Sequence, residues 1–155
     1  GGARGQGAEE GRLFASEGAA VVLTDVLDAD GEQTASEIGG MFLHHDVTSE
    51  EAWQGVVKEA VEQHGKVDIL VNNAGIYQNG LVTEMALEDY RRIIEVNQVG
   101  VFLGMKHVAP AIIATEFAQG RAQRLAAQVC DSSRVTAVRG GDACNGRFVA
   151  VVVLP

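Results

Sequence analysis

The chain of 155 residues is poor in several residue types, and each shortage narrows what it can be. Aromatic residues make up only 5%, so Val, Ile, Leu and Ala must fill the core. The two cysteines, Cys130 and Cys144, match no common metal spacing, which favours a reduced pair in the cytoplasm. His44 and His45 lack enough convergent ligands, so no metal is expected. We also expect no membrane-spanning helix and no signal peptide.

Basic residues are scarce as well, and the formal net charge of −9 argues against binding nucleic acid or an anionic membrane. The charge is uneven. Residues 113–155 carry three acids and five arginines, a net of +2, so residues 1–112 carry −11. That tail contains no Lys at all. The chain therefore changes character near Ile112, although its length suits a single domain.

Residues 1–112 alternate between helical and strand patterns, which predicts an α/β fold with a Rossmann-like, doubly wound parallel sheet. The expected strands cover 19–25, 41–45 and 67–71, and the expected helices cover 7–17, 29–38, 48–65 and 87–112. Thr48 should cap the third helix, in whose apolar stripe Trp53 is expected to be core. Apolar residues surround most of the long fourth helix, so we expect it to be buried on more than one side.

Glycines and polar residues mark the ends of these strands. Gly1, Gly5 and Gly7 form a turn that a phosphate could approach closely, although three glycines alone could equally be a flexible terminus. Asp25 ends a strand about 20 residues later, where an acid can hold both ribose hydroxyls or simply be solvated. Asp46-Val47 and Asn72-Asn73-Ala74-Gly75 end the next two strands, at the sheet edge where ligands of such folds bind.

In this order and spacing the motifs resemble the short-chain dehydrogenase/reductase family. Its members carry T-G-x-x-x-G-x-G, an acid after the second strand, Asp-Val after the third, N-N-A-G after the fourth and an Asn in the following helix, matched here by Asn97. The resemblance covers about residues 1–112. The turn, Asp25 and the Gly-Val-Phe-Leu-Gly-Met run look most like bacterial NAD-dependent hydroxysteroid and secondary-alcohol dehydrogenases.

The resemblance implies a role for each matching residue. Gly1, Arg4, Gln6 and Gly7 would meet the pyrophosphate and adjacent ribose, Asp25 the adenosine ribose, Asp46 and Val47 the adenine, Asn73, Ala74 and Gly75 the route to the nicotinamide, and Asn97 a proton-relay water. A carboxylate at Asp25 repels a 2′-phosphate, which favours NAD over NADP, whereas Arg4 partly opposes that preference.

The family's catalytic Ser, Tyr and Lys have no counterpart. Neither tyrosine, Tyr77 or Tyr90, has a Lys four residues on, so no Tyr-x-x-x-Lys exists to supply a base for the hydroxyl proton. Leu125 stands where the Ser is expected, and Ser132 and Ser133 fit an exposed polar turn. Whether the chain is an enzyme is therefore uncertain, and we predict that it is inactive.

Residues 113–155 form a tail that departs from the family pattern, with a strand expected at 147–154. Its composition is typical of out-of-frame translation near 113–116, although a divergent tail would look similar. The fold is therefore expected to be incomplete, with its N-terminal first strand absent and its fifth strand and following helix replaced. Residues 149–154 are apolar enough to fill either missing strand position.

Two functions follow from these expectations. The first is a cytoplasmic NAD-dependent oxidoreductase that interconverts a secondary alcohol, with hydroxysteroids as one candidate class, and a ketone. The second is a non-catalytic fragment that binds the dinucleotide or docks on another subunit, because the family's equivalent of residues 87–112 helps form a homo-oligomer interface.

Overall fold

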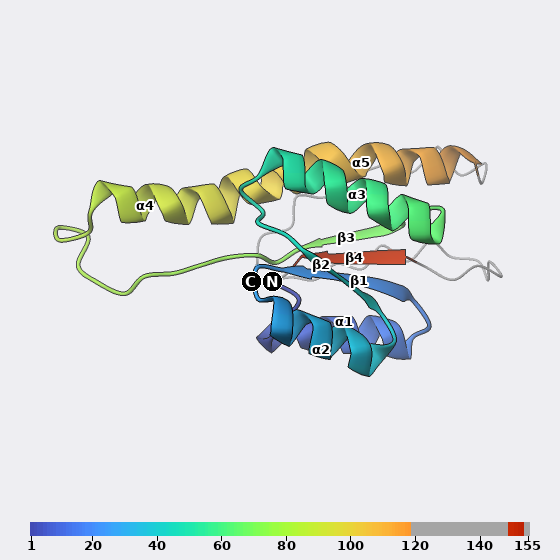
Figure 1. Cartoon of the computed structure of the whole chain (residues 1–155). Coiled ribbons are helices and arrows are strands. Elements are labelled where there is room, and N and C mark those ends of the chain that lie inside the picture. The colour runs from blue at the N-terminus through green and yellow to red at the C-terminus, as the bar shows by residue number, and fades with distance from the viewer. Residues whose placement is uncertain (119–148, 154–155) are drawn as a thin grey trace.

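The computed structural model describes residues 1–118 and 149–153. These residues form a parallel sheet with helices on both faces (Figure 1). Its strands are β1 (Ala20–Asp25), β2 (Met41–His44), β3 (Ile69–Asn72) and β4 (Val149–Val153), in the order β2-β1-β4-β3. The α/β prediction of a Rossmann-like, doubly wound and incomplete parallel sheet is thereby confirmed.

Two helical layers cover the sheet. Helices α1 (Gly5–Ser16) and α2 (Asp28–Ile38) lie on one face, and α3 (Glu50–His64) and α5 (Gly100–Ala118) lie on the other (Figure 1). Helix α4 (Leu87–Ile94) and a π-helical segment, η1 (Glu95–Val99), run directly into α5. The expected bounds agree within about two residues, except that the last helix continues six residues further than predicted.

Strand β4 comes from the end of the chain but lies inside the sheet. Val151 pairs with Val22 of β1 on one side and with Leu70 of β3 on the other, in parallel register on both. This position between β1 and β3 is the first of the two that its apolar sequence was expected to allow. Without β4, β1 and β3 would present unpaired edges to each other.

Strand β1 explains why helices are needed on both faces. Val22 faces a core formed with α3 and α5, while Val21 and Leu23 face a second core formed with α1 and α2. Successive strand residues point to opposite faces, so a strand that is apolar at four successive positions, Ala20 to Leu23, must be covered on both. Trp53 is fully buried in the first core and donates its indole N–H to the Val47 carbonyl at 2.9 Å.

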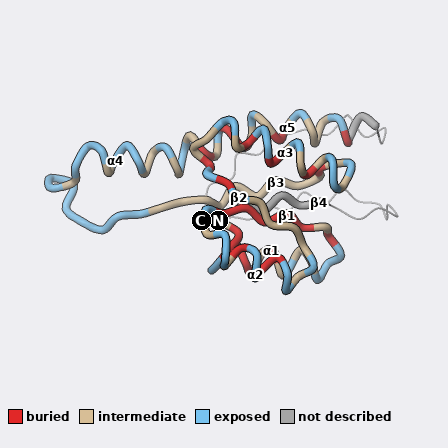
Figure 2. The backbone as a smooth tube through the Cα atoms, viewed as in Figure 1, coloured by how far each residue is buried: buried red, intermediate tan, exposed pale blue. Residues whose placement is uncertain are grey.

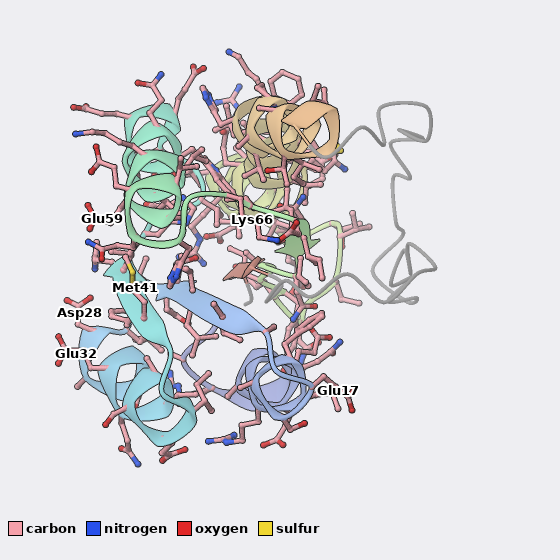
Figure 3. All side chains as sticks on the ribbon, turned by 90° about the vertical axis from the view of Figure 1, so that its right-hand side faces the viewer. Glu17, Asp28, Glu32, Met41, Glu59 and Lys66 are labelled. Carbon is pink, nitrogen blue, oxygen red and sulfur yellow. The ribbon has the colours of Figure 1, made fainter. Side chains whose placement is uncertain are left out.

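The long helix departs from the prediction in its first half. No residue of α4 is buried, and Leu87 and Tyr90 are more than half exposed; Figure 2 shows the segment projecting from the body of the protein. The expectation of burial on several sides is wrong here because no other described element packs on α4. Helix α5 does pack on α3 and β3 (Figure 3), and it buries Leu103 and Val108.

The same helical stretch corrects the expectation that nothing could span a membrane. Residues 87–115 are long and apolar enough to do so by length and composition. That criterion is weak evidence, because a core helix of a soluble protein also meets it.

The start of α3 differs from the prediction in one detail. The helix is capped by Ser49, whose Oγ accepts a hydrogen bond from the Ala52 N–H at 3.2 Å. Thr48, the predicted cap, instead donates its hydroxyl to Asp46 at 2.8 Å. Gly39 and Gly65 cap the C-termini of α2 and α3, both with positive φ.

Candidate functional site

The glycine turn, residues 1–7, lies against the carboxyl end of β1. The backbone nitrogens of Gly1 and Gly2 both donate to the Thr24 carbonyl, at 2.8 and 2.7 Å. Gly5 has a φ of 59°, which side chains disfavour, and it begins α1. The backbone conformation that begins α1 therefore favours glycine at position 5.

Helix α1 has a free N-terminus within the described structure. Its N-cap, Arg4, makes no side-chain capping bond, and its first turn holds no acidic residue. Helix α3, in contrast, has a capping serine and two acids in its first turn. Uncapped N–H groups and the positive end of the helix dipole favour an anion, so α1 is the better suited of the two to a phosphate group.

Asp25 ends β1 and ties the glycine turn to it. Its Oδ2 accepts from the Ala3 N–H and lies 3.0 Å from the Gly1 ammonium, while Oδ1 accepts from the Leu27 N–H at 3.1 Å. Burial alone would raise the pKa of this carboxyl, but these three donors outweigh burial and lower it. Asp25 is thus an ionised and nearly covered carboxylate that organises the corner where a ribose was expected.

Asp46 and Val47 follow β2 at the same edge. Asp46 accepts from the backbone N–H and the hydroxyl of Thr48, which shapes the turn into α3. Val47 is buried, and its carbonyl receives the Trp53 indole N–H. The ends of β1 and β2 are directly joined, because the His45 N–H donates to the Asp25 carbonyl at 2.8 Å.

His45 is a feature that the sequence pattern did not single out for this corner. Its Nδ1 lies 3.2 Å from the Thr24 hydroxyl, and its ring meets Trp53 edge-on at 4.4 Å between centroids. Burial lowers the pKa of His45 to about 4, so the imidazole is neutral at pH 7. The neighbouring His44 points outward and pairs with Asp28. No cluster of three possible metal ligands occurs within the described segments.

Asn97 joins the loop after β3 to the long helix. Its Oδ1 accepts from the Ile76 N–H at 2.8 Å and its Nδ2 donates to the Ile76 carbonyl at 2.9 Å. Asn97 lies in η1, and single π turns within α-helices are frequent at functional sites. A Cβ on Gly75 would lie 3.5 Å from the Asn97 amide oxygen, so the Asn73-Ala74-Gly75 segment and Asn97 are brought together.

The arrangement therefore unites the expected residues in two groups. The glycine turn, Asp25 and Asp46-Val47 share one corner, and Asn73-Ala74-Gly75 with Asn97 form the second group beyond β3. Ser132 and Ser133 lie outside the described residues. No Ser–Tyr–Lys set occurs in the parts of the chain that the structure describes, and the sequence contains no Tyr-x-x-x-Lys.

Comparisons with known proteins match this architecture. The short chain dehydrogenase family pattern matches residues 1–128. The chain belongs to the short-chain dehydrogenase family. Members use NAD or NADP, and they are typically oligomeric. The match continues beyond residue 112, where the resemblance was expected to end.

Individual relatives are similar over much of this chain. It is 41% identical to a trans-4-hydroxycyclohexanecarboxylate dehydrogenase of Sinomonas cyclohexanicum, across 74% of this chain and 48% of that protein. It is 37% identical to a 3-alpha-(or 20-beta)-hydroxysteroid dehydrogenase of Mycobacterium tuberculosis, across 94% of this chain and 54% of that protein. The chain thus spans about half the length of these relatives.

A solved structure supports the fold. The 3-ketoacyl-(acyl-carrier-protein) reductase of Brucella melitensis, complexed with NADH, superposes with a TM-score of 0.74 at 35% identity. The superposition covers 78% of this chain and 51% of that one.

The residues present fit a dinucleotide. The open N-terminus of α1 suits the pyrophosphate, and the glycine turn presents backbone rather than side chains at Gly5. At Asp25, Oδ1 accepts one hydrogen bond that the structure describes, and a carboxylate oxygen can accept about two. One acceptor position thus remains for a ribose hydroxyl.

Proposed function

We propose that this chain is the cofactor-binding part of an NAD-dependent oxidoreductase that interconverts a secondary alcohol and a ketone. The supporting observation is the corner where the glycine turn, Asp25 and the end of β2 meet beside the uncapped start of α1. The proposed cofactor ligands are Gly1, Arg4, Gln6, Gly7, Asp25, Asp46, Val47, Asn73, Ala74 and Gly75. Bound there, the dinucleotide would supply the hydride acceptor or donor.

NAD is the preferred cofactor in this proposal. The ionised Asp25 carboxylate puts a negative charge at the ribose corner, where it would repel a 2′-phosphate. Asn97 is proposed to position a proton-relay water, because its Oδ1 accepts one hydrogen bond from Ile76 and can accept a second. The names of the relatives point to a hydroxyl on an alicyclic ring, including the steroid class, as the substrate group.

We further propose that the chain as written binds the cofactor without turning over substrate, because it has no Tyr-x-x-x-Lys. The tail, residues 113–155, would then derive from a shift in reading frame, and the gene sequence tests this directly. If neither alternative frame after Ile112 encodes a Ser and a Tyr-x-x-x-Lys, that part is wrong. A cytoplasmic location belongs to the same proposal.

A second candidate is a non-catalytic subunit-docking fragment. It is favoured by the large apolar side chains exposed on and before α4, including Leu81, Val82 and Leu87. A cluster of exposed apolar side chains is typical of an interaction surface. The family's oligomers make a second copy, or a full-length relative, the expected partner.

One paired experiment separates these functions. NADH binding is measured by fluorescence titration, and turnover is then assayed with NAD and cyclic secondary alcohols, including a hydroxysteroid. The proposal predicts saturable binding without turnover. Measurable turnover would overturn the predicted inactivity, and a folded protein that binds no NADH would leave the docking function as the better account.

A further inference from the structure

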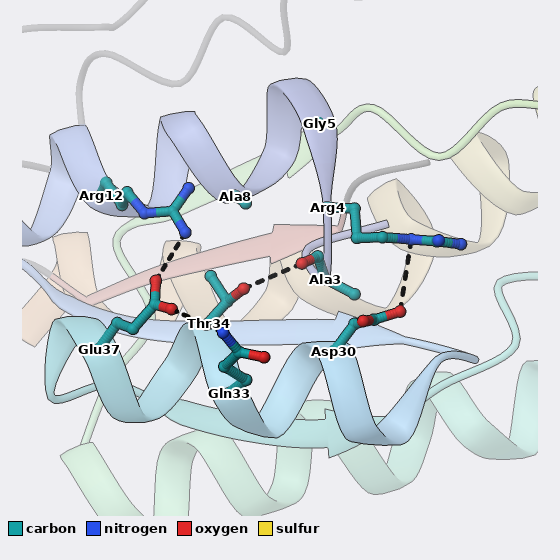
Figure 4. Close-up of a pocket in the computed structure, with 9 residues that line it drawn as sticks. All are labelled: Ala3, Arg4, Gly5, Ala8, Arg12, Asp30, Gln33, Thr34 and Glu37. Carbon is teal, nitrogen blue, oxygen red and sulfur yellow. Dashed lines mark hydrogen bonds and ion pairs between the residues drawn. The ribbon is translucent and has the colours of Figure 1, made fainter.

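A polar cavity of about 230 Å³ lies between α1 and α2, beside the glycine turn (Figure 4). Its charged lining comes as two opposed pairs. Arg12 binds Glu37 at 2.6 Å along the helices, and the Arg4 Nε lies 3.4 Å from the Asp30 Oδ2 next to the turn. The first pair lies away from the turn, while the second flanks the proposed ribose corner.

The position of Asp30 relative to the glycine turn is set by a buried contact. Thr34, one helical turn after Asp30, is 5% exposed and donates its hydroxyl to the Ala3 carbonyl at 2.9 Å. Ala3 in turn donates its N–H to Asp25. The glycine turn is therefore joined by hydrogen bonds to the end of β1 and to α2. These bonds hold Arg4 and Asp30 on neighbouring elements, where they form an ion pair.

We propose that Asp30 determines cofactor specificity by neutralising Arg4, so that the site takes a dinucleotide with a free 2′-hydroxyl and rejects a 2′-phosphate. This inference rests on the proposed dinucleotide function. An arginine binds phosphate through its N–H groups, and here the Arg4 Nε forms an ion pair with the Asp30 carboxylate at 3.4 Å. Asp25, Asp30 and Arg4 together carry a charge of −1, which opposes a group that itself carries close to two negative charges.

The charge at this corner changes if Asp30 is made neutral. In an Asp30→Asn variant Arg4 is free to meet a phosphate, and one repelling carboxylate is gone. We expect the ratio of NADP to NAD affinity to rise about tenfold, the size expected for one unit charge near a dianion in water. The variant should fold, because both side chains are largely exposed and such surface pairs contribute little stability.

The experiment titrates NAD and NADP separately into each folded protein by calorimetry. Glu32→Gln is the matched control, since it removes one acid from the same helix at an exposed position outside the cavity. Its affinity ratio should stay within about twofold of the unaltered protein. If Asp30→Asn binds NAD normally with an unchanged ratio, the inference fails while the proposed function stands. If the unaltered protein binds neither dinucleotide, both fail.

Arg4 gives a second and independent test. Arg4→Gln alone should lower NADP affinity by up to about tenfold, because the charge of Asp25, Asp30 and residue 4 together falls from −1 to −2. Combined with Asp30→Asn, the same substitution should abolish most of the tenfold gain. A gain that survives without Arg4, or an NADP affinity that Arg4→Gln leaves unchanged, would overturn the proposed pairing.

Discussion

His45 should make the stability of this protein sensitive to mild acid. Its imidazole is 2% exposed and packs edge-on against Trp53, with Nδ1 beside the Thr24 hydroxyl. Burial lowers the pKa of His45 from 6.5 to about 4. Between these two pH values His45 is protonated in the unfolded chain but neutral in the folded protein. Folding therefore becomes less favourable as the pH falls.

The magnitude follows from the two pKa values. Well above pH 6.5, His45 does not lower the free energy of unfolding. Its destabilising effect grows as the pH falls from 6.5 towards 4. A tenfold difference in proton affinity corresponds to about 1.4 kcal/mol, so the full loss is about 3 kcal/mol. Asp25 also has a lowered pKa; its contribution begins to fall at the acid end of this window and is lost mainly below the ordinary value of 3.8.

The assay is urea unfolding between pH 8 and pH 4 on the unaltered protein and on a His45→Phe variant. Phenylalanine keeps the ring against Trp53 but cannot titrate. It leaves the Thr24 hydroxyl without its partner, which costs about 1 to 3 kcal/mol at every pH. His44→Gln, at the exposed neighbouring position, is the control and should keep the slope. Equal slopes for His45→Phe and the unaltered protein would refute the reasoning.

Four further substitutions test the fold and the second residue group. Val151→Pro removes a backbone donor from a strand with a neighbour on each side, so the free energy of unfolding in urea should fall by about 1 to 3 kcal/mol; an unchanged midpoint would exclude β4 from the sheet. Gly31→Ala should lower the free energy of unfolding by about 1 to 3 kcal/mol in the same assay, because its Cβ would lie 2.0 Å from the Phe42 ring. Gly55→Ala is the contrasting case: its Cβ would have nothing within 4 Å, so it should stabilise α3 by about 0.5 to 1 kcal/mol. Asn97→Ala removes both hydrogen bonds to Ile76, so the loop after β3 should lose hydrogen-exchange protection. Equal protection of that loop in both proteins would contradict the role assigned to these two hydrogen bonds.

The helices and strands could be predicted because the residues that face the core recur at a regular spacing in the sequence. Strand β1 is apolar at successive positions, which only a strand covered on both faces can accommodate, and Val21 and Val22 do face different cores. The position of β4 could not be decided in advance, because residues 149–154 suit any buried parallel strand. That choice depends on the two open edges of β1 and β3, which no local pattern encodes.

Burial and hydrogen-bond partners were harder to predict than secondary structure. The apolar residues of α4 show that the helix could be covered, but not that any element covers it. An acid at the position of Asp25 suits a ribose, yet only the coordinates show that the N–H groups of Ala3 and Leu27 already bind it. The pairing of Arg4 with Asp30 was missed because the two residues lie on different elements.

Calorimetric titration of NAD into the folded full chain tests the central claim most directly. The account predicts saturable binding of one NAD per chain, with NADP binding more weakly. An additional Asp25→Ala variant, checked for folding by circular dichroism, should lose most of that affinity. A protein with the circular dichroism of the α/β fold that takes up no NAD would contradict the claim that this corner is a dinucleotide site.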